Sequence, residues 1–262
     1  MTGQPDLKSL LDFAVGVARE AGVITQRYFK GSFAVERKSD NSFVTAADRE
    51  AERFLRTSIK KAFPDDAILG EEEGAKTGKS NRRWILDPID GTYSFVHKVP
   101  LYGVLIGLEI DDEAVLGVVN LPALDEQVYA ASGLGCFWNE RPAQVSLTGS
   151  LSDALLLATD FADCERYGFG RAAEMLQKQV QARRTWGDVY GHVLVATGRA
   201  EIMLDPIMNV WDCGPLLSIV EEAGGTFTDW QGQRTIHGGN AISTNGRLFE
   251  PVMSAIRKAE ES

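Results

Sequence analysis

The chain has 262 residues, of which 44% are hydrophobic and 24% charged, and its formal net charge is −10 at pH 7. That length can form one large domain or two modest ones, and the composition is typical of a soluble globular protein. The negative charge argues against nucleic-acid binding, and the sequence contains neither a membrane-spanning apolar run nor a signal-peptide pattern.

The first half of the chain predicts two helices followed by a run of strands. Apolar residues at helical spacing favour a long amphipathic helix over residues 7–30. A second helix should run from Thr45 to about Phe63, because Thr45-Ala46-Ala47-Asp48 resembles a capping box. Residues 75–81 are polar and typical of a mobile loop. The strands expected in this half are 67–69, a segment beginning at Trp84, 102–110, 114–120 and 127–132.

The second half alternates between strand-like and helical patterns. Its expected strands are 154–159, 200–204, 226–229 and 241–244. Its expected helices are 169–181, 188–197, 211–223 and 247–259, the third of which ends at Gly224-Gly225, where glycine can adopt the left-handed conformation. We therefore expect two α/β lobes, residues 1–145 and 146–262, with a site in the cleft between them.

The strand-like segment that begins at Trp84 ends abruptly in two carboxylates, Asp87 and Asp90, followed by Gly91 and Thr92. Pro88 stiffens the backbone between the two acids, and Gly91 permits a tight turn. Two carboxylates this close repel each other unless a cation lies between them, and a hard divalent cation suits them. Asp and Gly are also ordinary turn residues, so a plain turn is the alternative for this motif alone.

Further acidic residues favour the metal interpretation. Glu71 and Glu72 directly follow a predicted strand, whereas Asp48 and Asp212 lie in the first turns of predicted helices. Acids in a first turn also complement the helix dipole and cap free N–H groups, so capping is the alternative for both. Four residues form the oxygen-rich, histidine-poor set that Mg²⁺ prefers: Glu71, Asp87, Asp90 and Asp212.

Other patterns point toward phosphate chemistry. If a short helix begins at Gly91-Thr92, its free backbone N–H groups face whatever the metals hold, which favours a phosphoryl group. The sequence has neither a Ser–His–Asp order nor a Gly-rich P-loop. Three widely spaced cysteines fit the reducing cytoplasm, and three histidines are expected at surface or packing positions: Cys136, Cys164 and Cys213, and His97, His192 and His237.

Several motifs occur in one order from about residue 8 to about residue 258. They are Val44-Thr45 with Ala47-Asp48, Gly70-Glu71-Glu72, Trp84 through Phe95, and Trp211-Asp212 leading to Glu222-Ala223-Gly224-Gly225. On these motifs the chain resembles the inositol monophosphatase superfamily of metal-dependent phosphatases. The resemblance implies a layered α/β/α/β/α sandwich, a homodimer, and two to three divalent cations per active site, Mg²⁺ with Mn²⁺ as a substitute.

The resemblance also implies a ligand set. Glu71, Asp87 and the backbone carbonyl of Ile89 would bind the first cation. Asp87, Asp90 and Asp212 would bind the second, and Glu71 with waters would hold a weaker third.

It implies catalytic roles as well. Thr92 and Asp48 resemble the pair that orients the attacking water and helps to deprotonate it, and Glu72 is a further catalytic candidate. Gly91 and Thr92 would donate backbone N–H groups to the substrate phosphate.

Within the superfamily, the second half is most similar to the histidinol-phosphate phosphatases. The run 183–191 replaces the small Gly-Ser/Thr-Ala-Ala stretch of inositol phosphatases, and Asp205 lies seven residues before Asp212, where inositol-reading relatives place a glutamate. Histidinol phosphate carries an ammonium group, which extra carboxylates would favour. A helix cap is the alternative for Asp188, and core packing is the alternative for Trp186. The candidate substrate contacts are Arg184, Trp186, Asp188, Asp205 and Asp212.

The sequence therefore predicts hydrolysis of a phosphate monoester by in-line attack of a metal-activated water, with histidinol phosphate as the substrate. No nucleophilic side chain fits a covalent intermediate. One alternative is the same chemistry on inositol-1-phosphate or a broader set of sugar phosphates. A metal-dependent regulatory or scaffolding protein and a bisphosphate nucleotidase are further alternatives. The complete acidic set argues against the former. Bisphosphate nucleotidases are generally longer and need basic residues for a second phosphate, which argues against the latter.

Overall fold

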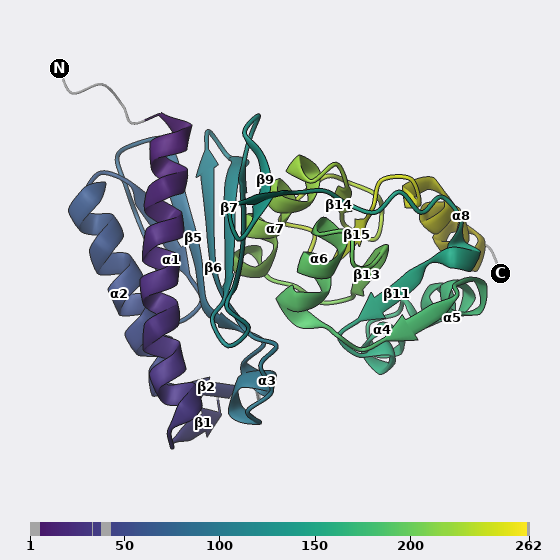
Figure 1. Ribbon diagram of the computed structural model, residues 1–262, viewed down its shortest axis with the longest axis horizontal. Helices are drawn as coiled ribbons and strands as arrows, with labels where there is room; N and C mark the ends of the chain where they lie inside the picture. The colour runs from purple at the N-terminus through teal and green to yellow at the C-terminus, as the bar shows by residue number, and fades with distance from the viewer. Residues whose placement is uncertain (1–5, 33, 38–42, 261–262) are drawn as a thin grey trace.

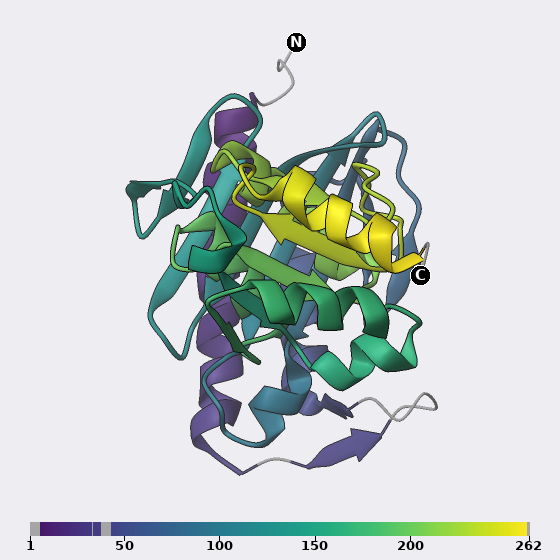
Figure 2. The same ribbon diagram turned by 90° about the vertical axis from the view of Figure 1, so that its right-hand side faces the viewer.

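The computed structural model describes residues 6–32, 34–37 and 43–260, which fold into alternating layers of helices and sheets (Figures 1 and 2). The helices are α1 (Leu7–Lys30), α2 (Ala46–Ala62), α3 (Thr92–Val96), α4 (Phe161–Arg166), α5 (Gly170–Gln179), α6 (Asp188–Ala196), α7 (Val210–Glu222) and α8 (Phe249–Glu260). Helices α1 and α2 cover one face of a large sheet, and α6 and α7 lie between that sheet and a smaller one. Helices α4, α5 and α8 cover the far face of the smaller sheet. The predicted α/β/α/β/α sandwich is confirmed.

The large sheet has the strand order β10-β9-β8-β7-β6-β5-β3-β4, in which β3 and β5 are parallel and the other neighbours antiparallel. Its strands are β3 (Ala67–Gly70), β4 (Gly74–Lys76), β5 (Arg82–Asp90), β6 (Gly103–Ile110), β7 (Glu113–Leu121), β8 (Glu126–Ala131), β9 (Gly135–Trp138) and β10 (Arg141–Ala143). The prediction of a loop over residues 75–81 is wrong at its first two residues, which belong to β4 and pair with β3. β4 is a short edge strand, and three half-exposed residues carry no alternating pattern to reveal it.

The smaller sheet has the order β12-β11-β13-β15-β14, with β11 parallel to both of its neighbours. Its strands are β11 (Leu155–Ala158), β12 (Ala182–Arg184), β13 (Ile202–Asp205), β14 (Thr226–Thr228) and β15 (Ala241–Thr244). A separate hairpin of β1 (Val35–Arg37) and β2 (Phe43–Thr45) lies near α3 in Figure 1. The sequence patterns did not predict β1, β2, β9, β10, β12 or α4, all of which are at most six residues long and too short to show a hydrophobic period.

Local signals fixed the helix ends well. Thr45 and Asp48 form the predicted capping box at the start of α2, and Asp6 caps α1 by accepting the backbone N–H of Ser9. After α7, Gly224 has φ +88°, the left-handed conformation expected there.

Two glycines let α7 lie directly on the large sheet. A Cβ on Gly117 would come within 1.9 Å of the Pro215 carbonyl oxygen, and one on Gly107 within 3.0 Å of the Gly214 carbonyl carbon. Any side chain at Gly117 would therefore push the helix away. This close approach fixes the N-terminal end of α7, which carries Asp212, against the large sheet.

The remaining composition-based expectations concern membranes and thiols. Among the described helices, none combines the length and the apolar character that crossing a membrane requires. The three cysteines are free and buried, as expected in the absence of a disulfide framework.

Candidate metal and phosphate site

The end of β5 brings two carboxylates to one point. Asp87 pairs with Leu105 of β6, and the register then shifts before Asp90 pairs with Gly103. The irregularity coincides with Pro88, which has no N–H to donate to the ladder. Asp87 is buried, and its Oδ1 accepts the backbone N–H of Ile89 at 2.9 Å. The bulge thus orients the acidic end of the strand.

Asp212 joins these two acids from the other half of the chain. It occupies the third position of α7, where its Oδ2 accepts the backbone N–H of Asn209 at 2.7 Å in a capping box. One carboxylate oxygen from each of Asp87, Asp90 and Asp212 lies within 4.8 Å of the others. We call these three residues the acidic triad. Capping therefore accounts for one oxygen of Asp212 and leaves the other for a ligand.

Burial and mutual repulsion shape the electrostatics of the triad. Burial is the main cause that raises the pKa of Asp212 to about 6, opposed by its hydrogen bonds with Asn209. Burial, and then the charges of Glu71, Asp90 and Asp212, raise the pKa of Asp87 well above its ordinary value. A cation held among the three carboxylates would relieve this repulsion, and carboxylate oxygens are the donors that Mg²⁺ prefers. The donor set fits a hard divalent cation.

A second group of acids lies beside the triad. Asp48 is fully buried, and its Oδ2 accepts the backbone N–H and the hydroxyl of Thr45 at 2.8 and 2.6 Å. Its Oδ1 is buried without a hydrogen-bond partner among the described residues. Burial, with the charges of Glu72 and Glu71 adding to it, raises the pKa of Asp48 to about 7. Asp48 therefore caps α2 with one oxygen and presents the other, unsatisfied oxygen near Glu71 and Glu72.

Gly91 and Thr92 form the turn after β5. Gly91 has φ +78° and ψ +39° and precedes α3, and a Cβ there would lie 2.9 Å from the Leu101 carbonyl oxygen. The short helix expected at this step is present as α3. The Thr92 hydroxyl donates to the Ile89 carbonyl oxygen at 2.9 Å, so the expected pairing partner of Thr92, Asp48, does not hold that hydroxyl in this structure. A carbonyl oxygen has a second lone pair, which leaves Ile89 able to bind a cation.

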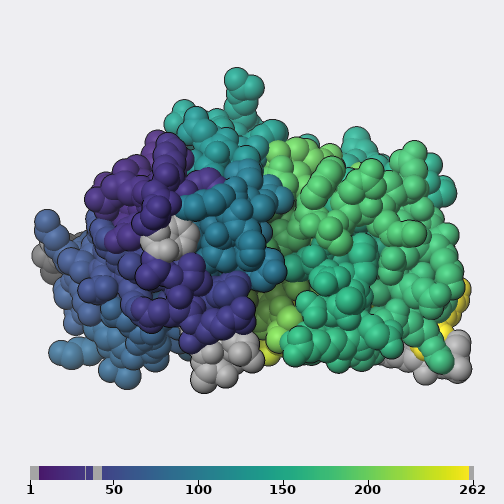
Figure 3. Space-filling model, turned by 90° about the horizontal axis from the view of Figure 1, so that it is seen from below, coloured from purple at the N-terminus to yellow at the C-terminus, as the bar shows by residue number. Residues whose placement is uncertain are grey.

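A carboxylate-lined cavity continues from the triad toward the second half of the chain. It has a volume of about 170 Å³, and its lining includes Asp90 and Asp212 from the triad together with Asp163, Asp188 and Asp205. A neighbouring cavity of about 500 Å³ shares Asp163 and Asp188 and adds Tyr93, Ser94 and Thr185. In the view from below, the purple and blue first half meets the green second half along this side of the molecule (Figure 3).

Thr159 ties Asp188 to Asp205. Its hydroxyl accepts the backbone N–H of Asp188 at 2.8 Å and donates to Asp205 Oδ2 at 3.0 Å. Gly187 is the cap residue of α6, Asp188 is the first residue of the helix, and the Asp188 carboxylate makes a hydrogen bond with the Ser94 side chain. Burial raises the pKa of Asp188 to about 6 and that of Asp205 well above its ordinary value. Both acids are thus desolvated carboxylates that face a cavity.

Two other sequence candidates, Arg184 and Trp186, are not among the lining residues of these cavities. Trp186 is 43% exposed, so the alternative that it packs in the core is wrong. The Arg184 guanidinium lies 6.0 Å from the centre of the Trp186 ring. Neither side chain lines either cavity. The sequence reasoning missed Thr159 and Asp163, which lie at the end of β11 and in the unpredicted helix α4.

The histidines do not enter the triad. His192 is fully buried, its Nδ1 lies 2.7 Å from the Ser243 hydroxyl, and its Nε2 lies 4.0 Å from Asp205 Oδ2. His97 stacks on Tyr93, and His237 is 53% exposed. A larger cavity of about 710 Å³ lies elsewhere, and its one acid, Glu222, already accepts the backbone N–H groups of Gly133 and Gly135. Among the described residues, the acidic triad is the group of three acids whose carboxylate oxygens lie close enough together to hold a metal ion.

The layered fold and the acidic cluster are those of a phosphoric monoester hydrolase. The chain belongs to the inositol monophosphatase family, whose model matches residues 6–261. It is 42% identical over 252 residues to the histidinol-phosphatase of Chlorobaculum parvum, covering 95% of this chain and 97% of that protein. The histidinol-phosphatase of Mycobacterium tuberculosis is 36% identical over 252 residues, covering 94% and 97%. The solved Thermotoga maritima IMPase is 33% identical, with a TM-score of 0.87 over 97% of this chain and 98% of that one.

Proposed function

We propose that this protein hydrolyses histidinol phosphate, with Mg²⁺ or substituting Mn²⁺ held by Glu71, the acidic triad and the Ile89 carbonyl. The observation that carries the proposal is the continuity between the acidic triad and the cavity lined by Asp188 and Asp205. The triad suits cations that bind a phosphate, and the adjoining carboxylates suit a positively charged leaving alcohol. Similarity to proteins named histidinol-phosphatase supports the same substrate.

Each site residue has a proposed role in the hydrolysis. Two to three bound cations would activate a water and neutralise charge on the transferring phosphoryl group. Asp48 Oδ1, which has no hydrogen-bond partner among the described residues, would accept a proton from the attacking water, and Thr92 would orient that water through its hydroxyl. The backbone N–H groups of Gly91 and Thr92 would hold phosphate oxygens. Glu72 acts on Asp48 through its charge.

The site would select its substrate by the charge of the substrate's alcohol part. Asp188 and Asp205 are desolvated, and a charge-assisted hydrogen bond to an ammonium group contributes roughly 1.5–3 kcal/mol, or about ten- to a hundredfold in rate preference. A neutral polyol cannot use these carboxylates in that way. Arg184 and Trp186 remain candidates at the outer rim of the substrate site.

A second candidate is hydrolysis of inositol-1-phosphate or a wider set of sugar phosphates, which the likeness to the Thermotoga maritima IMPase favours. A substrate panel with released phosphate as the readout separates the candidates. Histidinol phosphate should be hydrolysed fastest. A wild-type enzyme that prefers inositol-1-phosphate would overturn the substrate assignment and leave the phosphatase chemistry standing.

Asp188→Asn makes the panel sharper. Asp188 has φ +51°, a conformation that asparagine tolerates, so the backbone should be preserved. The variant should lose about ten- to a hundredfold in its rate of hydrolysis of histidinol phosphate. It should lose little with glycerol-2-phosphate, whose alcohol part is uncharged. Asp205→Asn should act in the same direction. Equal losses on both substrates would mean that Asp188 supports the scaffold and does not contact the amine.

Two wider features belong to the same proposal. We propose a cytoplasmic homodimer, and the exposed aromatic side chains of Tyr93 and Trp186, 68% and 43% exposed, are consistent with a covered surface near the site. We also propose that residues 1–145 and 146–262 form two lobes. Light scattering of the purified protein tests the dimer, and limited proteolysis near residue 145 tests the division.

A further inference from the structure

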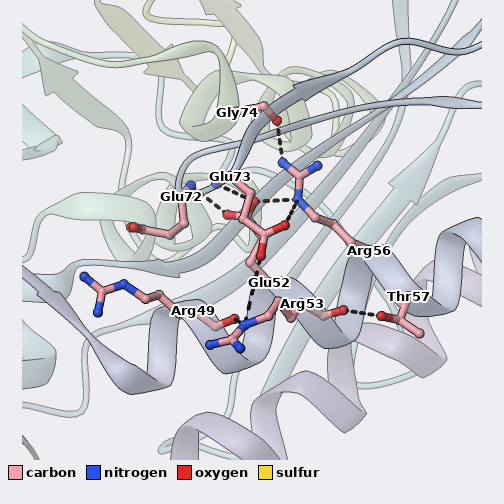
Figure 4. Close-up of polar contacts among 8 residues, drawn as sticks. All are labelled: Arg49, Glu52, Arg53, Arg56, Thr57, Glu72, Glu73 and Gly74. Atoms are coloured by element: carbon pink, nitrogen blue, oxygen red, sulfur yellow. Dashed lines mark hydrogen bonds and ion pairs between the residues drawn. The ribbon is translucent and has the colours of Figure 1, made fainter.

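A buried carboxylate on α2 holds the turn that carries Glu71 and Glu72. Glu52 is fully buried and lies four residues after Asp48, on the same face of the helix. Its Oε2 accepts the backbone N–H of Glu72 at 2.7 Å, and its Oε1 accepts the backbone N–H of Glu73 at 3.0 Å. Figure 4 shows Glu52 reaching from α2 to this turn. One side chain therefore satisfies two successive backbone donors.

Arg56 completes the arrangement one helical turn further on. It is 4% exposed, and its Nε donates to Glu52 Oε1 at 2.7 Å. Its Nη2 donates to the Gly74 carbonyl oxygen, and its Nε also lies 3.6 Å from Glu73 Oε2. We call residues 71–73 the acidic turn. Glu52 and Arg56 hold this turn by hydrogen bonds to the backbone of Glu72 and Glu73 and of the following residue, Gly74 (Figure 4).

The last residue of β3 is shaped to this pair. A Cβ on Gly70 would lie 2.3 Å from Glu52 Oε1 and 2.7 Å from Arg56 Nη2. A side chain at Gly70 would therefore displace the carboxylate or the guanidinium. The absence of that side chain lets the end of β3 press against Glu52.

The acidic turn needs such a restraint. It contains three consecutive glutamates, and the charge of Glu71 acts unfavourably on Asp48, Asp87 and Asp212. Without cations, like charges drive the turn away from the site. Glu52 and Arg56 oppose this by hydrogen bonds to the backbone of the turn, and Glu52 itself does not belong to the acidic triad.

We propose that Glu52, together with Arg56, is a positioning residue that holds the acidic turn at a fixed distance from Asp48 and so sets the affinity of the site for divalent cations. The proposal rests on the proposed function only in taking Glu71 as a cation ligand. Asp48 and Glu52 lie one turn apart on one helix, so the same helix fixes both the unsatisfied carboxylate oxygen and the turn that faces it. Groups that support metal ligands in this way typically change metal affinity by roughly 10–100-fold when removed.

The test compares Glu52→Gln with Asp66→Asn. Glutamine keeps the size of Glu52 but places an NH₂ group where backbone N–H groups and Arg56 need acceptors. Asp66 is an equally buried carboxylate at the opposite end of β3, where it accepts from Ser80, Arg82 and Trp84 at 2.8–2.9 Å. Each protein is characterised by circular dichroism, thermal denaturation in EDTA, Mn²⁺ binding by electron paramagnetic resonance, and phosphate release as a function of Mg²⁺.

Glu52→Gln should weaken Mn²⁺ binding by roughly 10–100-fold, raise the Mg²⁺ concentration needed for activity in parallel, and recover the wild-type kcat at saturating Mg²⁺. Asp66→Asn should lower the melting temperature with the wild-type Mn²⁺ affinity. Wild-type Mn²⁺ affinity in Glu52→Gln, or equal losses of affinity in both variants, overturns the proposal.

Two further outcomes keep the test decisive. If Glu52→Gln does not fold, Glu52→Asp, which retains the charge but shortens its reach, is compared with Asp66→Asn by the same criterion. If the wild-type protein releases no phosphate from any monoester while Glu52→Gln still loses Mn²⁺ affinity, the proposed function fails and the positioning role stands.

Discussion

Replacing Asp212 with asparagine should stabilise the metal-free protein even though it removes one of the proposed cation ligands. Asp212 is held among like charges and shielded from water, and its pKa rises from 3.8 to about 6. A pKa that differs by one between the folded and unfolded states corresponds to about 1.4 kcal/mol, so keeping Asp212 ionised above pH 6 costs at most about 3 kcal/mol of folding free energy. Asparagine retains an oxygen that can accept the Asn209 N–H.

The sign and size of the effect can be checked by thermal denaturation in EDTA. A gain of about 3 kcal/mol corresponds to at most about 6–12 °C in Tm for a chain of this size. Because the folded-state pKa is raised, the penalty is complete above about pH 6 and disappears as the pH falls toward 3.8. The difference between Asp212→Asn and the wild type should therefore shrink between pH 7 and pH 4.5.

Magnesium supplies the second half of this test. The wild type should gain about 2.7 kcal/mol at a Mg²⁺ concentration 100 times its Kd, and Asp212→Asn should gain far less. Asp153→Asn, which removes the charge of an exposed acid, is the matched control and should leave both curves unchanged. If Asp212→Asn is no more stable than the wild type in EDTA at pH 7.5, burial and charge repulsion do not disfavour the ionised Asp212 carboxylate in the folded protein, and the reasoning is refuted.

Two further predictions concern catalysis and acid stability. Thr92→Ala should leave metal binding nearly intact and lower kcat by roughly 10²–10⁴, the range for lost acid–base assistance; steady-state kinetics with wild-type kcat would leave Thr92 only its backbone contact. Burial lowers the pKa of His192 from 6.5 to about 3, so the folded state loses stability as the pH falls below 6.5, by about 2 kcal/mol at pH 5. His192→Asn should flatten the dependence of unfolding free energy on pH between 6.5 and 5 in urea titrations, and an unchanged slope would assign that dependence to other groups.

Local chemistry made much of the fold predictable from the sequence. The helical period of residues 7–30 and the Thr45–Asp48 capping box depend on neighbouring residues alone, and both appear as predicted. The strand β12 and the helix α4 were not predictable, because three and six residues are too few to show a repeated hydrophobic pattern. Asp163, which lies in α4, was missed as a cavity residue for the same reason.

The site shows the same division. The motif at the end of β5 identified Asp87 and Asp90, and Asp212 was singled out as an acid in the first turn of a predicted helix; the structure brings the three together. Glu52 and Arg56 have the spacing of an ordinary surface ion pair on a helix, and nothing local reveals that the pair is buried against a turn nearly twenty residues away. Their role depends on tertiary contact, which a pattern of residue types does not contain.

The position of Asp212 in the sequence has a consequence for the protein during its synthesis. Glu71, Asp87 and Asp90 are synthesised early, whereas the helix that brings Asp212 to them begins at Val210 and is synthesised more than a hundred residues later. That helix also fills the core beneath the large sheet, so the nascent first half has neither its full core nor its full set of ligands. If the proposed ligand set is right, cation binding requires both halves of the chain, and a nascent chain that lacks the second half cannot yet hydrolyse phosphate esters.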